Sequence, residues 1–129
     1  MRRVAPLFAL LALAGCNGGT VDLHALQNDS ESIDSLACEG ALLAGEIEHT
    51  ATTSAFARVH AGDLATKASN FEDALSSRPT TPGIEKATRD EAKKAGQIGA
   101  LLRQLESSPT DAALAARLKP RLEKQGECA

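Results

Sequence analysis

Alanine, leucine and isoleucine recur at intervals of three and four residues along most of this 129-residue chain. That spacing places them on one face of an α-helix, whereas a half-buried strand would alternate apolar and polar residues. Alanine and leucine are strong helix formers, and runs of β-branched residues are missing. The chain is therefore predicted to fold into an all-α domain whose helices pack through these apolar faces.

Three breaks divide the apolar pattern into four segments. Residues 77–83 contain two prolines and a glycine, and residues 107–110 contain another proline, so no helix is expected to continue through either stretch. Residues 50–54 are a weaker break, made mostly of threonines and a serine, which are poor inside a helix and good at its N-cap. Pro120 is expected to kink the last helix, and Gly126 to end it. Helices are expected over 30–49, 52–76, 84–106 and 111–125.

The predicted third helix carries charged residues on its outer face. Glu85 with Arg89, and Asp90 with Lys94, are four residues apart and are expected to form weak ion pairs on that face. Glu91 lies on the apolar face instead. There it either meets Arg58, Lys67 or His60 across the bundle or stays hydrated at the edge of the face.

The first sixteen residues have the composition of an export signal. Arg2 and Arg3 precede a short apolar run that ends in small residues and a cysteine. The run is too short to span a membrane as a permanent helix, so it is predicted to be a secretory signal peptide. Its end resembles the lipobox of bacterial lipoproteins, with the residues Leu13, Ala14, Gly15 and Cys16.

The resemblance implies cleavage before Cys16 and acyl chains, palmitate among them, on the thiol and the new amino group of that residue. Such chains would anchor the protein to the outer face of the cytoplasmic membrane or to the outer membrane. In a source with two membranes the resemblance implies the outer one, because the usual signal for retention at the inner membrane is an aspartate after the cysteine, and this chain has Asn17 there. The alternative is an ordinary signal peptide cut near Gly15, which leaves a free thiol. The lipoprotein interpretation divides the chain into three parts. Residues 1–15 are the signal peptide, residues 16–30 are a flexible lipidated tether reaching about 20 Å, and residues 31–129 are the helical bundle.

Composition excludes several classes of function. Removing residues 1–15 from the 129 leaves 114, with 12 basic and 17 acidic side chains. Such a mildly acidic chain is not expected to bind nucleic acid or to seek anionic lipid headgroups. The chain has no tryptophan or tyrosine, which argues against a sugar-binding face or a base-stacking surface.

The two remaining cysteines, Cys38 and Cys128, predict one disulfide, because an even pair in an exported chain is usually oxidised. Two unpaired thiols are the alternative. One unbroken helix over 30–76 would leave Cys128 about 45 Å from Cys38, whereas bridged Cα atoms lie within about 7 Å. A turn at 50–54 returns Cys128 to the level of Cys38. A bridge therefore favours a small antiparallel four-helix bundle over the three-helix alternative.

A few residues suggest a metal site. Glu46 and His49 form a Glu-x-x-His motif on one face of the predicted first helix, a pattern found in di-iron bundles. His60 and Asp63 form the inverted pattern on the second helix, and Glu91 lies on the third. If the turn at 50–54 brings the first two helices together, a metal-binding bundle becomes the alternative function. Otherwise Glu46 and His49 are hydrated residues near the C-terminal end of a helix, where a histidine interacts favourably with the negative end of the helix dipole.

No catalytic set is recognisable. The sequence contains no Gly-x-Ser-x-Gly elbow, no glycine-rich phosphate loop and no Cys-x-x-Cys motif. We therefore expect a membrane-anchored lipoprotein that is not an enzyme and needs no cofactor. Its role would be binding or structural, with a protein partner in the cell envelope, for example through an Ala/Leu groove that accepts a helix or peptide.

Overall fold

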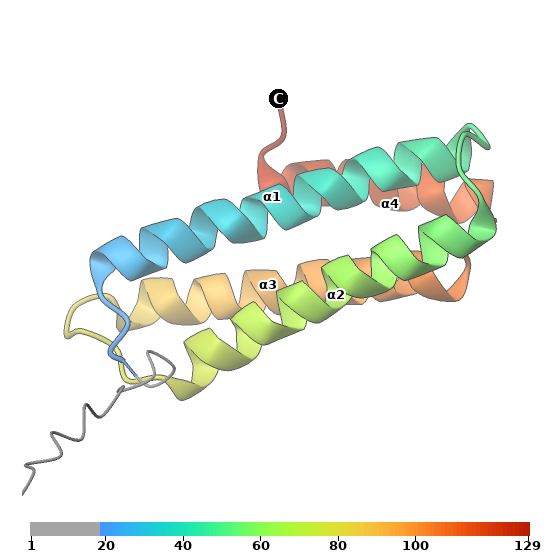
Figure 1. Ribbon diagram of the computed structural model, residues 1–129. Helices are drawn as coiled ribbons and strands as arrows, with labels where there is room; N and C mark the ends of the chain where they lie inside the picture. Colours follow the sequence, from blue (N-terminus) through green and yellow to red (C-terminus); the bar gives the residue numbers. More distant parts are fainter. Residues whose placement is uncertain (1–18) are drawn as a thin grey trace, which may run out of the picture.

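The computed structural model describes residues 19–129, which form an antiparallel bundle of four helices (Figure 1). They are α1 (Leu23–Glu48), α2 (Ser54–Ser77), α3 (Glu85–Ser107) and α4 (Ala112–Gly126). The predicted all-α four-helix bundle is confirmed, and the three-helix alternative is wrong because the chain turns between α1 and α2. None of these four helices is both long and apolar enough to cross a bilayer. The predicted signal peptide, the lipobox and Cys16 lie outside the described residues.

The helices form two pairs. α1 packs mainly against α4 and α2 mainly against α3, and Figure 1 shows the pairs as two layers. The shortest helix, α4, begins beside the C-terminal end of α1 and stops beside its middle. The first turns of α1, before Asp34, consequently extend past the end of α4.

Local caps explain the turn between α1 and α2. Thr50 has a φ of 53°, so the backbone leaves α1 in the left-handed region, and the Ala51 N–H donates to the Glu46 carbonyl at 2.7 Å. The Thr53 hydroxyl then accepts from the Phe56 N–H at 3.2 Å and caps α2. The weak break in the apolar pattern is therefore a complete turn, as predicted.

The predicted apolar faces form the core, with one change of register at the start of α3. Ala87, which its spacing from Ile84 and Glu91 places on the apolar face, is exposed, and Thr88 takes the buried position beside it. The Thr88 hydroxyl donates to the Ile84 carbonyl at 2.9 Å, so its burial leaves no unsatisfied donor. The largest fully buried side chains include Ile33, Leu43, Leu64, Ile98, Leu102, Leu105, Leu118 and Leu122.

Small residues let α2 and α3 approach closely. A Cβ on Gly99 of α3 would lie 3.6 Å from the Ala68 Cβ of α2. A Cβ on Gly96 would meet the Glu72 carboxylate, its nearest oxygen at 2.6 Å. A methyl group at Gly99 would make an ordinary van der Waals contact, and one at Gly96 would displace only the flexible Glu72 side chain, so the packing requires neither glycine. The buried small residues of the pair are Ala57, Ala61, Ala65 and Ala68 on α2, with Ala92, Ala95 and Gly99 on α3.

The end of α4 differs from its prediction. Gly126 lies inside the helix, and the left-handed cap is Glu127, with a φ of 50°. Pro120 also lies within α4, which continues past it. What Gly126 provides is space, because a Cβ there would lie 2.7 Å from the Asp34 carbonyl oxygen and 2.7 Å from the Cys38 sulfur. The last turn of α4 therefore rests directly on the backbone of α1.

The structure also differs from the flexible tether predicted over 16–30. Helix α1 begins at Leu23, where the Asp22 carboxylate accepts from the Ala25 N–H at 2.8 Å. Val21, just before this cap, is fully buried. Within the predicted tether, the residues from Gly19 onward are therefore part of the folded body.

Candidate functional site

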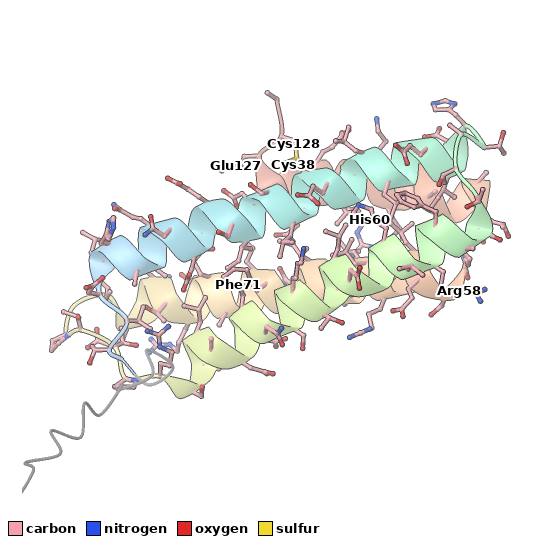
Figure 2. The ribbon with its side chains drawn as sticks, viewed as in Figure 1. Cys38, Arg58, His60, Phe71, Glu127 and Cys128 are labelled. Carbon is pink, nitrogen blue, oxygen red and sulfur yellow. A yellow bond between two sulfur atoms is a disulfide. The ribbon has the colours of Figure 1, made fainter. Side chains whose placement is uncertain are left out.

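A disulfide joins Cys38 in α1 to Cys128, two residues past the end of α4, as predicted. The two Cα atoms are 5.6 Å apart, and Figure 2 labels both side chains. The bridge spans 90 residues of sequence and fixes the end of α4 against the middle of α1. It accounts for two of the three cysteines of the chain.

A cross-helix ion pair lies between α1 and α3. Lys94 donates to Asp34, and their side chains are only 20% and 29% exposed. The predicted pair of Asp90 with Lys94 is therefore wrong. Asp90 accepts from Lys86 at 2.7 Å instead, and this hydrogen bond holds the pKa of the Asp90 carboxyl below its ordinary value.

The second predicted pair of α3 is also replaced. The Glu85 carboxylate accepts from the Gly83 N–H at 2.9 Å, and among the described residues it makes no ion pair with Arg89. Hydrogen bonds from the backbone N–H groups of Glu85 itself and of Gly83 lower the pKa of this carboxyl. Glu85 thus closes the loop that precedes α3.

Glu91 is the one residue in the described range whose side chain has a buried oxygen atom without a hydrogen-bond partner. The cross-bundle partners considered from the sequence, Arg58, Lys67 and His60, form no ion pair with it among residues 19–129. A buried carboxylate oxygen without a partner costs free energy. One carboxylate oxygen of Glu91 is thus buried at the apolar face, whereas the residue as a whole is partly exposed.

The candidate metal residues do not converge. His49 caps the C-terminal end of α1 and is exposed, as is Glu46 one turn earlier. The ring of His60 stacks on that of Phe56, with centroids 5.4 Å apart, and both belong to α2. Figure 2 labels His60 in the space between α1 and α2. Within residues 19–129 no three His, Cys, Asp or Glu side chains, Asp63 included, are grouped to hold a metal ion.

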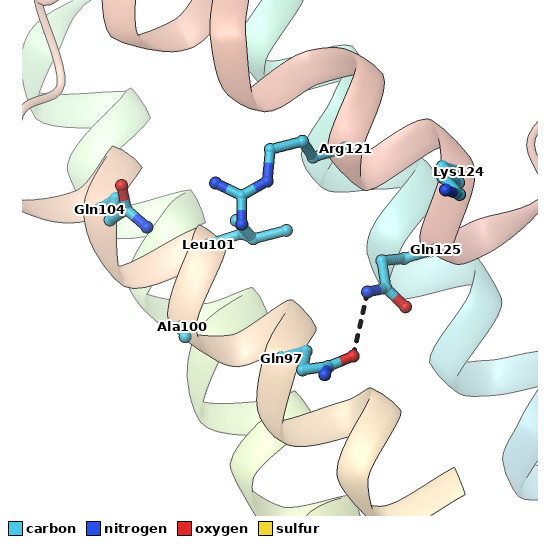
Figure 3. Close-up of a pocket in the computed structure, with 7 residues that line it drawn as sticks. All are labelled: Gln97, Ala100, Leu101, Gln104, Arg121, Lys124 and Gln125. Carbon is cyan, nitrogen blue, oxygen red and sulfur yellow. Dashed lines mark hydrogen bonds between the residues drawn. The ribbon is translucent and has the colours of Figure 1, made fainter. Parts of the chain in front are cut away.

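An open hollow lies between α3 and α4 and is lined by residues of both helices (Figure 3). The buried Leu101 lies at this hollow. Across it, the side-chain amide nitrogen of Gln125 donates to the side-chain amide oxygen of Gln97 at 3.1 Å. Arg121 and Lys124 lie on the α4 side, and within the described chain neither forms an ion pair. Amides and free cations of this kind can bind a carboxylate or phosphate.

This hollow was missed by the sequence interpretation. Its signal is the spacing of Arg117, Arg121 and Lys124, which repeats cations every three or four residues on one face of α4. That face alone does not locate a hollow. The hollow exists because α3 and α4 pack less closely with each other than with their partners α2 and α1.

The N-terminal segment, residues 19–22, lies against the loop between α2 and α3. The Val21 N–H donates to the Pro79 carbonyl at 2.8 Å, and the Val21 carbonyl accepts from the Thr81 N–H at 2.9 Å. The Arg78 guanidinium donates to the Gly19 carbonyl at 2.9 Å. Three hydrogen bonds and one buried side chain thus hold the start of the described chain in place.

The geometry comprises a disulfide-linked bundle, a polar hollow and a clamped N-terminal segment. Comparisons of the chain with protein-family models, with curated proteins and with solved structures found no match.

Proposed function

We propose that this protein is an extracytoplasmic lipoprotein, acylated at Cys16 and held on a membrane, with a binding or structural role rather than an enzymatic one. The membrane is the outer membrane or the outer face of the cytoplasmic membrane. The partner is a protein of the cell envelope.

The disulfide between Cys38 and Cys128 carries the proposal. Disulfides form and persist in exported proteins and are rare in reducing compartments. The bridge therefore supports export, which is what the basic start and apolar run of residues 1–15 predict. The remaining cysteine is the one at the end of the lipobox-like motif.

The hollow between α3 and α4 supports a binding role. Its lining combines amides, cations and apolar groups, which recognise anionic or amide groups on a partner. The residues that line it include no nucleophile paired with a base, which is the arrangement used in covalent catalysis.

Detergent phase partitioning tests the proposal. The full-length chain, expressed in a bacterium that processes lipoproteins, is expected to enter the detergent phase and the membrane fraction. Cys16→Ser, which removes the acylated thiol and leaves the bundle unchanged, is expected to lose both properties while retaining the disulfide. A wild-type chain that stays in the aqueous phase, with the same behaviour as Cys16→Ser, would refute acylation at this residue.

A further inference from the structure

The chain is fixed to the bundle almost immediately after Cys16. The bonds of Val21 to Pro79 and Thr81, and of Gly19 to Arg78, hold the N-terminal segment from its first described residue. Only two residues, Asn17 and Gly18, lie between Cys16 and Gly19, so three Cα-to-Cα steps join them. Because an extended chain spans at most about 3.6 Å per residue, the thiol of Cys16 cannot lie much more than about 11 Å from Gly19.

The N-terminal segment lies at one end of the bundle. In Figure 1, α1 starts, α2 ends and α3 starts at this end, whereas the α1–α2 and α3–α4 loops lie at the opposite end. Helix α1 has 26 residues, which gives about 40 Å between the two ends. An anchor near Gly19 therefore holds one end of an elongated bundle close to the membrane and restricts how the bundle can turn.

We infer that the end formed by the N-terminal segment and the α2–α3 loop, residues 78–84, faces the lipid headgroups, and that the α1–α2 and α3–α4 loops project away from the bilayer. The inference rests on the proposed acylation of Cys16. It replaces the flexible tether, which would have left the orientation of the bundle free, with a short connection that sets it.

Several charges at this end are engaged within the fold. Arg78 donates to the Gly19 carbonyl, Lys86 is paired with Asp90, and Glu85 accepts from the loop backbone. Arg89 and Lys93, on the first turns of α3, are exposed and form no ion pair among residues 19–129, so anionic lipid would add its own attraction to this end. Vesicles of zwitterionic lipid remove that attraction, and in them the acyl anchor alone is expected to orient the protein.

A single introduced tryptophan reports the orientation, because the chain contains none. Pro82→Trp places the indole on the exposed α2–α3 loop, and Thr110→Trp is the matched variant on the exposed α3–α4 loop. Each acylated full-length protein is reconstituted in vesicles of zwitterionic phosphatidylcholine carrying bromine, a short-range quencher, near the headgroups. Pro82→Trp is expected to lose most of its emission, and Thr110→Trp to keep it.

Three outcomes separate the claims. Protein that does not float with the vesicles overturns the acylation on which the inference rests. Protein that floats but shows equal quenching of the two indoles, or stronger quenching of Thr110→Trp, overturns the orientation and leaves acylation standing. As a control, ten glycine and serine residues inserted between Gly18 and Gly19 are expected to reduce the quenching of Pro82→Trp without affecting flotation, since the insertion lengthens the connection.

Discussion

The last residue of α4, Gly126, lies so close to the Asp34 carbonyl of α1 that a Cβ would come within 2.7 Å of that oxygen. The same Cβ would lie 3.0 Å from the Ala37 Cβ and 2.7 Å from the Cys38 sulfur. Backbone atoms cannot move aside as a flexible side chain can. The close contact of α4 with α1 therefore requires glycine, which has only a hydrogen atom in place of a side chain. The position of the disulfide that follows α4 depends on the same contact.

Gly126→Ala is expected to lower the free energy of unfolding by about 1–3 kcal/mol, because the new methyl group overpacks a helix contact. Urea unfolding followed by circular dichroism measures the change. Gly45→Ala is the matched control inside α1, since its Cβ would meet only the flexible Lys119 side chain at 3.4 Å. That control is expected to gain about 0.5–1 kcal/mol from helix propensity. Equal effects of the two substitutions would show that the contact at Gly126 is not tight.

Replacing both Cys38 and Cys128 by serine is expected to cost about 2–5 kcal/mol of stability, since the bridge closes a loop spanning 90 residues. The short helix α4 has the fewest residues to hold it and is expected to lose its amide-exchange protection first. Hydrogen exchange by mass spectrometry, compared with urea unfolding of the whole domain, checks both expectations. Unchanged protection in α4 together with unchanged stability would contradict the role given to the bridge.

The Asp34–Lys94 ion pair is expected to couple its two residues by about 1 kcal/mol, more than the exposed Lys86–Asp90 pair does. The reason is burial, because the first pair is less screened by water than the second. Two double-mutant cycles, with asparagine for aspartate and methionine for lysine, measure both couplings by urea unfolding. A coupling at Lys86–Asp90 equal to or larger than that at Asp34–Lys94 would count against this ranking.

Asp29 is expected to make stability fall as pH rises. Burial raises the pKa of its carboxyl above the ordinary value, and attraction to Arg78 only partly offsets this. The folded chain thus binds the proton more tightly than the unfolded chain, so stability is lost above the ordinary aspartate pKa of about 3.9. Asp29→Asn is expected to be more stable than the wild type at pH 7, with the difference disappearing below about pH 4.

Thermal unfolding of Asp29→Asn between pH 3 and pH 8 provides the measurement. Asp63→Asn, at an exposed position of α2, is the control and is expected to follow the wild-type pH profile. An Asp29→Asn variant less stable than the wild type at every pH would show that attraction to Arg78 outweighs burial.

Local sequence patterns predicted most of the fold. The spacing of apolar residues and the prolines of residues 77–83 located three helices to within a few residues, and threonines marked the turn before α2. The predicted disulfide between Cys38 and Cys128 then favoured four helices over three, because only a reversal of the chain at 50–54 brings the two cysteines together. These predictions succeeded because each depends on residues close in sequence or on one long-range constraint.

The features that were missed depend on contacts between distant segments. Val21 is buried because its backbone pairs with a loop almost 60 residues later in the chain. The residues around Val21 carry no sign of this pairing, so their polar composition predicted a flexible tether. Lys94 pairs with Asp34 of α1, a residue 60 positions earlier in the chain, and the pattern of α3 alone cannot reveal such a partner. Gly126 likewise resembled a helix stop until its contact with Asp34 was known.

Intact-mass analysis of the protein from the membrane fraction, without reductant, tests the central claim most directly. The account predicts a chain that begins at Cys16, heavier than its sequence by acyl groups on that residue, with Cys38 and Cys128 resistant to alkylation until reduced. An unmodified chain that begins at Met1 in the cytosol, with all three cysteines alkylated at once, would contradict it.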